Sequence, residues 1–200
     1  MSLACRQFYP EIPLIILGHS LGSLVVTQLL KEDHELYQAA ILIGIINLPS
    51  VAKLFAPAIK SFQPLESTRL TRELNQKAYN VFNQDFQSGE KFGWVTNNPM
   101  VRKQLELDPL VGYDYTLASW QLIAQLALTT NSDDWLAGLP ADYRLLIMSG
   151  SLDPAGGYGL RLSKLTTAIS TRNLLNVETK LCYRMQHELL FDRQNEAVFQ

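Results

Sequence analysis

The feature that most constrains the fold of this chain is a glycine-flanked serine that directly follows an apolar run. Residues 13–17 read Pro-Leu-Ile-Ile-Leu, and residues 18–22 read Gly-His-Ser-Leu-Gly. Apolar residues then recur at helical spacing between Leu21 and Leu30. This context is typical of a sharp strand-to-helix turn that exposes a serine hydroxyl, and glycines are expected on both sides because a side chain there would meet backbone. We therefore expect a strand, a turn at Ser20 and a helix.

Other apolar segments predict the rest of a sheet. Strand candidates after the first one are residues 39–46, 144–148 and 177–183, and helical stretches cover residues 21–31 and 159–169. Continuous apolar runs suit strands that are buried on both faces of a parallel sheet, whereas the alternation in 177–183 suits a partly exposed strand. Alternating strands and helices predict an α/β fold with a parallel sheet of about four strands.

The interval between the second and third strand candidates is too long for a simple crossover. We expect residues 48–142 to form an inserted, mainly helical lid, and residues 1–47 and 143–200 to form an incomplete core. The interval is rich in aromatic residues, namely Phe55, Phe62, Tyr79, Phe82, Phe86, Phe92, Trp94, Tyr113, Tyr115, Trp120 and Trp135. Most of them are expected to form the core of the lid, and the alternative is that several face Ser20 and hold an acyl chain.

Composition excludes several classes of protein. The formal net charge is −2 and no block of basic residues is present, which argues against nucleic acid as a partner. No apolar run approaches the roughly 20 residues that a membrane-spanning helix needs. The first six residues lack the apolar core of a secretory signal, and the only two cysteines, Cys5 and Cys182, form no metal motif. We expect both thiols to be reduced and the chain to be cytoplasmic.

A serine hydroxyl needs a base within hydrogen-bond reach, and the chain has only three histidines. His19 neighbours Ser20 in the turn, so its side chain is expected to point elsewhere. His34 lies in a charged stretch that is typical of a solvated helix end. His187 follows the last strand candidate, and we expect it to be the base, the alternative being a structural histidine.

The acid that orients the base is expected after an intermediate strand. Asp153 lies in a Gly- and Pro-rich loop after the strand candidate at 144–148, where open α/β sheets place their sites. The alternative is that Asp153 caps a turn. The order Ser20, Asp153, His187 is the nucleophile, acid and base order of α/β-hydrolases.

These segments carry a family resemblance. Residues 18–23 (Gly-His-Ser-Leu-Gly-Ser), 108–113 (Asp-Pro-Leu-Val-Gly-Tyr), 150–154 (Gly-Ser-Leu-Asp-Pro) and 187–190 (His-Glu-Leu-Leu) resemble the α/β-hydrolases of the monoacylglycerol lipase and lysophospholipase group. Residues 80–86 are similar to the lid of that group, and the resemblance extends from Tyr9 onward.

The resemblance implies a serine ester hydrolase that acts on single-chain lipids without a metal or organic cofactor. It implies that Ser20 is the nucleophile, Asp153 the acid and His187 the base, and that the Leu21 amide is an oxyanion donor. A lid of this kind can also touch a membrane peripherally.

The chain departs from the family pattern in several ways. The family's His-Gly segment, which supplies a second oxyanion amide, is absent from the sequence, and the first four strands have no counterpart. Residues 184–186 (Arg-Met-Gln) replace a Gly-containing turn before the histidine, so that His187 could be displaced from Ser20. The last helix is expected from Arg193 to Gln200.

The missing strands leave the strand before Ser20 as a bare apolar edge, which invites association with another chain. We therefore expect either a C-terminal fragment of a longer enzyme or a chain whose edge strand is covered by a partner. The alternative to a hydrolase is a non-catalytic remnant that acts as a binding subunit. A third hypothesis is cleavage of N-terminal peptides. The lack of an obvious acidic pair in the lid that would bind the amine argues against it, and residues 133–134 are the one candidate for such a pair.

Overall fold

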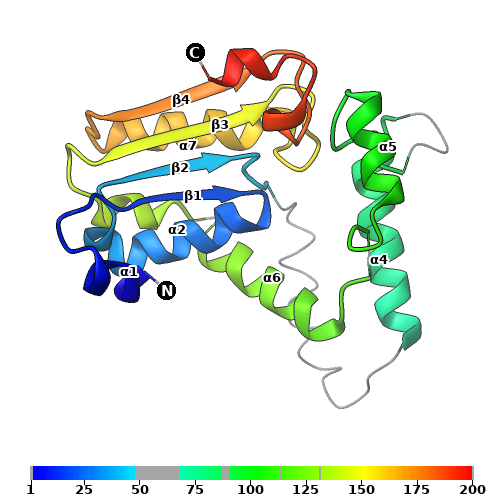
Figure 1. Ribbon diagram of the computed structural model, residues 1–200, viewed down its shortest axis with the longest axis horizontal. Coiled ribbons are helices and arrows are strands. Elements are labelled where there is room, and N and C mark those ends of the chain that lie inside the picture. Colours follow the sequence, from blue (N-terminus) through cyan, green and yellow to red (C-terminus); the bar gives the residue numbers. More distant parts are fainter. Residues whose placement is uncertain (1, 48–67, 87–90, 113, 131, 200) are drawn as a thin grey trace.

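The sheet consists of parallel strands in sequence order. The computed structural model describes residues 2–47, 68–86, 91–112, 114–130 and 132–199 (Figure 1). Its sheet has the order β1-β2-β3-β4, in which every neighbouring pair is parallel. The strands are β1 (Ile15–His19), β2 (Ala39–Ile43), β3 (Arg144–Gly150) and β4 (Val177–Cys182). The α/β fold with a four-stranded parallel sheet is thus confirmed.

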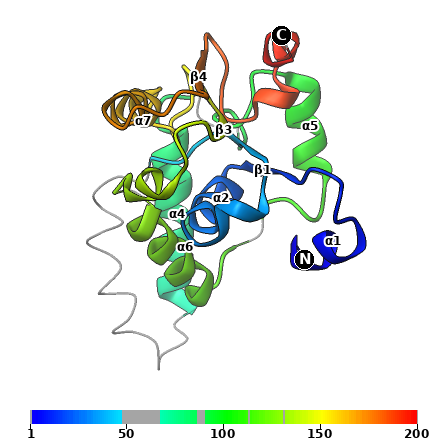
Figure 2. The same cartoon turned by 90° about the vertical axis from the view of Figure 1, so that its left-hand side faces the viewer.

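The two faces of the sheet are covered differently. Helices α2 (Leu21–Asp33) and α7 (Leu160–Thr171) pack on one face, where Leu30 and Leu165 meet the inward side chains of β2 and β3, such as Leu42. The other face is covered by the C-terminal turns, through Leu189 and Val198 (Figure 2). Because β2 and β3 are buried on both faces, their sequences are continuous apolar runs rather than alternating ones.

Helices dominate the described residues between β2 and β3. They are α4 (Thr68–Asn83), α5 (Pro99–Leu107), α6 (Leu117–Thr130) and the 3-10 helix η2 (Asp134–Gly138). In Figure 1, α4 and α5 lie beyond the carboxyl ends of the strands, and α6 returns to pack against α2. The expected lid boundary at residue 48 lies outside the described residues, so the division into core and lid stays a prediction.

The C-terminal end of the chain differs from the sequence expectation. Helix α1 (Ser2–Phe8) precedes β1, and a 3-10 helix η1 (His34–Leu36) follows α2. The last helix expected from Arg193 to Gln200 is wrong, because that region holds only the 3-10 helix η4 (Asn195–Val198), preceded by η3 (Leu189–Phe191). Hydrogen bonds three residues apart, such as Ala197 N–H to Gln194 O at 3.1 Å, tighten this segment and leave no room for an α-helical turn.

The outer strands carry exposed apolar residues. At the edge strand β1, Ile15 and Leu17 are 57% and 52% exposed. In the outer strand β4, Leu181 is 51% exposed and the adjacent Cys182 is buried, in line with the partly exposed strand that the alternation in 177–183 predicts. No helix among the described residues is long and apolar enough to cross a membrane.

Candidate active site

Ser20 occupies a sharp turn between β1 and α2. Its backbone lies at φ 54° and ψ −122°, a left-handed conformation that costs about 1–3 kcal/mol for a residue with a side chain. The Ser20 N–H donates to Ile43 O at 3.0 Å, and the Ser20 carbonyl accepts from Ser23 N–H and Ser23 Oγ at 2.8 and 2.6 Å. The end of β2 and the first turn of α2 therefore fix the strained residue from both sides.

The two glycines that flank this turn have different roles. A Cβ at Gly18 would lie 2.4 Å from Gly22 O and 2.7 Å from Val26 Cγ2, so only glycine fits there. A Cβ at Gly22 would meet nothing within 4 Å. The expectation that both positions are crowded is therefore wrong for Gly22, which lies in the first turn of α2 and faces open space.

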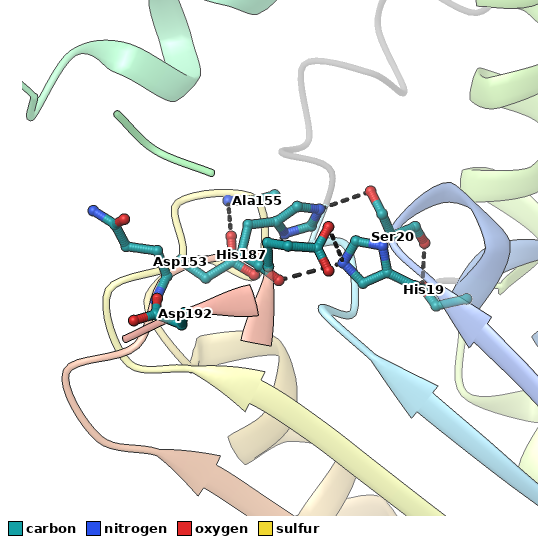
Figure 3. A network of polar contacts seen from close by, with 9 residues as sticks. His19, Ser20, Asp153, Ala155, His187 and Asp192 are labelled. Carbon is teal, nitrogen blue, oxygen red and sulfur yellow. Dashed lines mark hydrogen bonds and ion pairs between the residues drawn. The ribbon is translucent and has the colours of Figure 1, made fainter. Parts of the chain in front are cut away.

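The structure brings Ser20, His187 and Asp153 together (Figure 3). Ser20 Oγ lies 2.7 Å from His187 Nε2, and His187 Nδ1 lies 2.9 Å from Asp153 Oδ2. Asp153 is 0% exposed and His187 is 3% exposed. Three side chains from three separate strand ends thus form one continuous hydrogen-bonded relay.

Asp153 is held by its own loop, after β3. Its other carboxylate oxygen, Oδ1, accepts from Ala155 N–H at 2.8 Å, and its carbonyl accepts from Tyr158 N–H at 2.8 Å. The alternative that Asp153 caps a turn is therefore also realised, because one oxygen binds the loop backbone while the other faces His187. Because the same carboxylate binds the loop backbone and faces His187, its orientation toward the imidazole is fixed.

The loop that carries His187 is well anchored even though the glycine turn of the resembling family is missing. Arg184 adopts the left-handed conformation, with φ 60°, that a glycine would take easily. The Arg184 N–H donates to Ser151 Oγ at 2.8 Å, and Gln186 N–H donates to the buried Asp192 Oδ2 at 3.0 Å. The substitution of Arg184 for glycine therefore does not move His187 away from Ser20.

His19 is the neighbour that the sequence interpretation missed. Its side chain points toward the His187 loop: its Nε2 lies 3.4 Å from His187 O and 3.6 Å from Glu188 Oε2, and the two imidazole rings are 5.1 Å apart. Burial lowers the pKa of His19 from 6.5, against the opposing effect of the Glu188 carboxylate. The side chain therefore favours the neutral form, and it links the turn at Ser20 to the loop at His187.

The remaining histidine lies outside this site. His34 begins η1, and its ring meets the Tyr143 ring edge-on at 6.1 Å. It therefore packs on the core instead of extending into solvent, as the charged sequence around it had suggested.

Aromatic residues of the insert divide between site and core. The Trp94 ring lies 4.9 Å from the His187 ring, and Phe82 of α4 stacks on Trp94 at 4.8 Å. Trp135, by contrast, is 1% exposed in the core beneath α2 and α7. Phe55, Phe62 and Tyr113 lie outside the described residues.

The Tyr158 hydroxyl bonds to Asp85, directly after α4. Burial and this bond raise the pKa of Tyr158 to about 12. The loop that holds Asp153 is therefore linked to the insert.

Leu21 is the first residue of α2, so its N–H is one of those that a helix leaves without an intrahelical acceptor. This amide directly follows Ser20, as a donor to a developing oxyanion must. Among the described residues, no group of three or more His, Cys, Asp and Glu side chains is arranged to hold a metal ion.

The geometry is suited to proton transfer from a hydroxyl. An imidazole between a hydroxyl and a buried carboxylate can take the hydroxyl proton, while the carboxylate holds its tautomer and stabilises the imidazolium that forms. A parallel α/β sheet whose strand ends carry a Ser, an Asp and a His in this order defines an α/β-hydrolase.

Within that class, the chain belongs to the family described as serine aminopeptidase, S33, whose model matches residues 3–194. No curated protein sequence matches the chain.

Solved structures share the fold at low sequence identity. A thermostable carboxyl esterase from Bacillus coagulans has a TM-score of 0.85 at 18% identity, and the match covers 98% of this chain and 64% of the esterase. A lipase in its open form has a TM-score of 0.83 at 20% identity and 97% and 64% coverage. A monoglyceride lipase variant from Saccharomyces cerevisiae has a TM-score of 0.66 at 18% identity and 99% and 62% coverage. The chain thus spans about 64% of the length of the first two proteins.

Proposed function

We propose that this protein is a serine hydrolase of carboxylic esters, and that Ser20, His187 and Asp153 are its nucleophile, base and acid. The observation that carries the proposal is the pair of hydrogen-bond distances at His187, 2.7 Å to Ser20 Oγ and 2.9 Å to Asp153 Oδ2. These distances are those of a base that is ready to accept a proton and of an acid that orients it.

The proposed reaction proceeds through an acyl-enzyme. Ser20 Oγ attacks the ester carbonyl carbon while its proton moves to His187 Nε2, and the Leu21 N–H donates to the oxyanion that forms. The intermediate collapses as the C–O bond to the alcohol breaks and His187 returns the proton to the departing alcohol. Water then attacks the acyl-serine with His187 as the base, which releases the carboxylic acid and restores the Ser20 hydroxyl.

For the substrate class we propose single-chain lipid esters of the monoacylglycerol or lysophospholipid type. Support comes from the aromatic rings of Trp94 and Phe82, which put apolar surface beside the imidazole. Support also comes from the sequence segments at 18–23, 108–113, 150–154 and 187–190. Solved structures with the same fold include proteins named as a carboxyl esterase and a monoglyceride lipase. Peripheral contact of the lid with a membrane stays a prediction.

Peptide cleavage at an amino terminus is less well supported, although the family description names aminopeptidases. The acidic pair at 133–134 was the candidate for binding an amine. Asp133 Oδ1 lies 2.7 Å from Arg161 Nη2, and Arg161 is buried. The carboxylate is therefore already neutralised by a guanidinium, which leaves little attraction for a substrate ammonium.

The alternative function is a binding subunit without turnover. The observation that favours it is that residues 1–200 contain no His-Gly segment, and removal of one oxyanion donor from a hydrolase costs about 2.7–4 kcal/mol of transition-state stabilisation. We propose that a partner strand covers β1, which pairs only with β2 among the described strands and carries the exposed Ile15 and Leu17. A second donor could be supplied by that partner.

Hydrolysis of monoacylglycerol and of a matched lysophospholipid by the purified chain tests the proposal. We expect fatty-acid release that is lost in Ser20→Ala and in His187→Ala, while both variants keep the thermal unfolding of the parent. Folded protein that releases no fatty acid from either lipid, or a Ser20→Ala variant that releases it at the parent rate, would contradict the proposed function and favour the binding subunit.

A further inference from the structure

A short segment of the insert is bound directly to the loop that carries His187. We call residues 94–98 the strut and residues 184–193 the His187 loop. The N–H of Glu188 donates to Val95 O at 2.7 Å, which fixes the backbone one residue after His187. The Asn97 side chain spans the same loop, because its Nδ2 donates to Arg184 O at 3.4 Å and its Oδ1 accepts from Arg193 N–H at 3.2 Å.

The strut also holds the far part of the loop. The Phe191 carbonyl accepts from Thr96 Oγ1 at 3.5 Å and from Asn98 Nδ2 at 3.4 Å, and Thr96 is 0% exposed. Backbone and side chains of consecutive strut residues therefore bind both ends and the middle of the His187 loop. A single surface contact would not place hydrogen bonds along the whole length of the His187 loop.

The side chain of His187 is in contact with the strut as well. The Trp94 ring lies 4.9 Å from the imidazole with an angle of 38° between the planes, and Phe82 of α4 stacks on Trp94 at 4.8 Å. The hydrogen bonds to Ser20 and Asp153 restrain the imidazole at its two nitrogens, in the plane of the ring. A neighbouring indole restrains tilting out of that plane, which hydrogen bonds resist only weakly.

We propose that the strut positions the base, so that Trp94 and Asn97 are positioning residues for His187 in addition to any contact of the insert with an acyl chain. This inference rests on the proposed function and deepens it. A displacement of about 1 Å in a reacting group can lower the rate about a hundredfold. Loss of the strut contacts therefore lowers the rate of the chemical step for every ester, whatever its chain length.

The kinetic test compares an acetyl ester with a decanoyl ester of the same alcohol. We expect Trp94→Leu to lower kcat at least about tenfold for both esters with little change in KM, and Trp94→Phe to restore most of the rate because it retains a ring. A rise in KM for the decanoyl ester alone would show that Trp94 acts only on the acyl chain, and would overturn the inference. An unchanged kcat in Trp94→Leu would overturn it as well.

Asn97→Ala provides a second variant with a matched control. Asn176 is an exposed asparagine that donates to a backbone carbonyl, Asp142 O at 2.9 Å, before β4 and outside the strut. We expect Asn97→Ala to lower kcat for both esters, and Asn176→Ala to leave it unchanged, at equal thermal stability. Equal kinetics in the two variants would contradict a positioning role for Asn97.

A readout that does not depend on turnover separates the two proposals. Because His187 Nδ1 lies 2.9 Å from the buried Asp153 Oδ2, we expect a proton shared by these two atoms to give a far-downfield resonance that exchanges slowly with water. We expect Trp94→Leu and Asn97→Ala to speed its exchange and Asn176→Ala to leave it unchanged. If the parent protein hydrolyses neither ester, the proposed function fails and this resonance alone decides whether the strut positions His187. Unchanged exchange in both strut variants would refute the inference.

Discussion

At the scale of single residues, the turn at Ser20 depends on the absence of one Cβ. Ser20 takes a conformation that only surrounding structure can enforce, and Gly18 allows the close approach of the α2 backbone at Gly22 O. The Ser20 hydroxyl is therefore presented by backbone geometry, while the reactivity that we propose for it depends on the distant His187. The conformation of the turn and the contact with His187 depend on different parts of the chain, so substitutions can change one without the other.

The two glycines of the turn give a matched pair of variants. Gly18→Ala places a Cβ 2.4 Å from a backbone oxygen, so we expect a loss of about 1–3 kcal/mol in the free energy of unfolding. Gly22→Ala meets open space within a helix, so we expect a gain of about 0.5–1 kcal/mol. Urea denaturation measures both. Similar effects of the two substitutions would contradict the packing derived for the turn.

His19 predicts a pH dependence of stability. Burial lowers its pKa from 6.5 in the folded protein, so the unfolded chain binds the proton more readily. Its contribution to stability is therefore present above pH 6.5 and is lost as the pH falls through the lower, folded-state pKa. We expect His19→Gln to lose less stability than the parent between about pH 8 and about pH 5. Parallel losses in the two proteins, measured by urea denaturation at each pH, would disprove this assignment.

At the scale of elements, the insert and the core are joined by buried charge as well as by the strut. Arg161 of α7 donates to Thr130 O, at the end of α6, at 3.1 Å, and it forms the ion pair with Asp133 at 2.7 Å. Arg161 and Trp135 line the same small cavity, and Trp135 belongs to the hydrophobic core although it lies between β2 and β3 in the sequence. The segment between β2 and β3 is therefore packed against the rest of the molecule on this side.

Removal of the guanidinium leaves a carboxylate with little access to solvent. We expect Arg161→Ala to lower the free energy of unfolding by about 3–5 kcal/mol, because the Asp133 charge loses its partner. Lys164→Ala, an exposed position on the same helix, is the control and should change stability by less than about 0.5 kcal/mol. Thermal or urea unfolding distinguishes the two. Equal small effects would mean that the pair is not buried in solution.

The strands illustrate what the sequence predicts and what it does not. Apolar runs locate β2 and β3 because strands buried on both faces need apolar side chains at every position. Strand ends are less well predicted, since β1 extends to His19 only because it pairs with Ile43 of β2. The alternation in 177–183 predicts a partly exposed strand, but it does not predict that Cys182 of β4 packs against Met185 and Val198 from the C-terminal turns. Neither partner is apparent from a strand pattern.

In the candidate site, too, the sequence predicts some residues, whereas the contacts of others depend on the tertiary fold. The sequence predicts Ser20, Asp153 and His187 as candidates because each residue type follows a strand in an informative order, and the structure brings the three side chains together. The contacts of His19 and Trp94 could not be predicted, because they depend on where a loop 168 residues away and an inserted segment meet. A histidine inside a Gly-x-Ser-x-Gly turn and a tryptophan that follows Gly93 and precedes Val95 carry no signal that specifies those partners.

At the scale of the whole molecule, the sheet formed by the described residues ends at β1, whose free edge is apolar. Ile15 and Leu17 on β1 are more than half exposed, and strand edges of this kind pair with other chains. The match to longer α/β-hydrolases covers about 64% of their length. We therefore expect the edge of β1 to determine whether the chain associates with another chain in solution.

Association through this edge is open to measurement. We expect the purified chain to associate as its concentration rises, and the double substitution Ile15→Lys with Leu17→Lys to reduce that association, because charge on an edge strand opposes pairing. Leu175→Lys, at a 76% exposed position before β4, is the control and should leave association unchanged. Sedimentation velocity over a range of concentrations gives the answer. A parent chain that remains monomeric throughout would remove the argument for a partner strand.

The most direct test of the whole account is covalent labelling with a fluorophosphonate, followed by peptide mapping. If Ser20, His187 and Asp153 act as proposed, the probe attaches to Ser20 of the folded parent protein, attaches nowhere in Ser20→Ala, and reacts far more slowly with His187→Ala. Folded protein that stays unlabelled at saturating probe, or label that maps to another residue, would contradict the account.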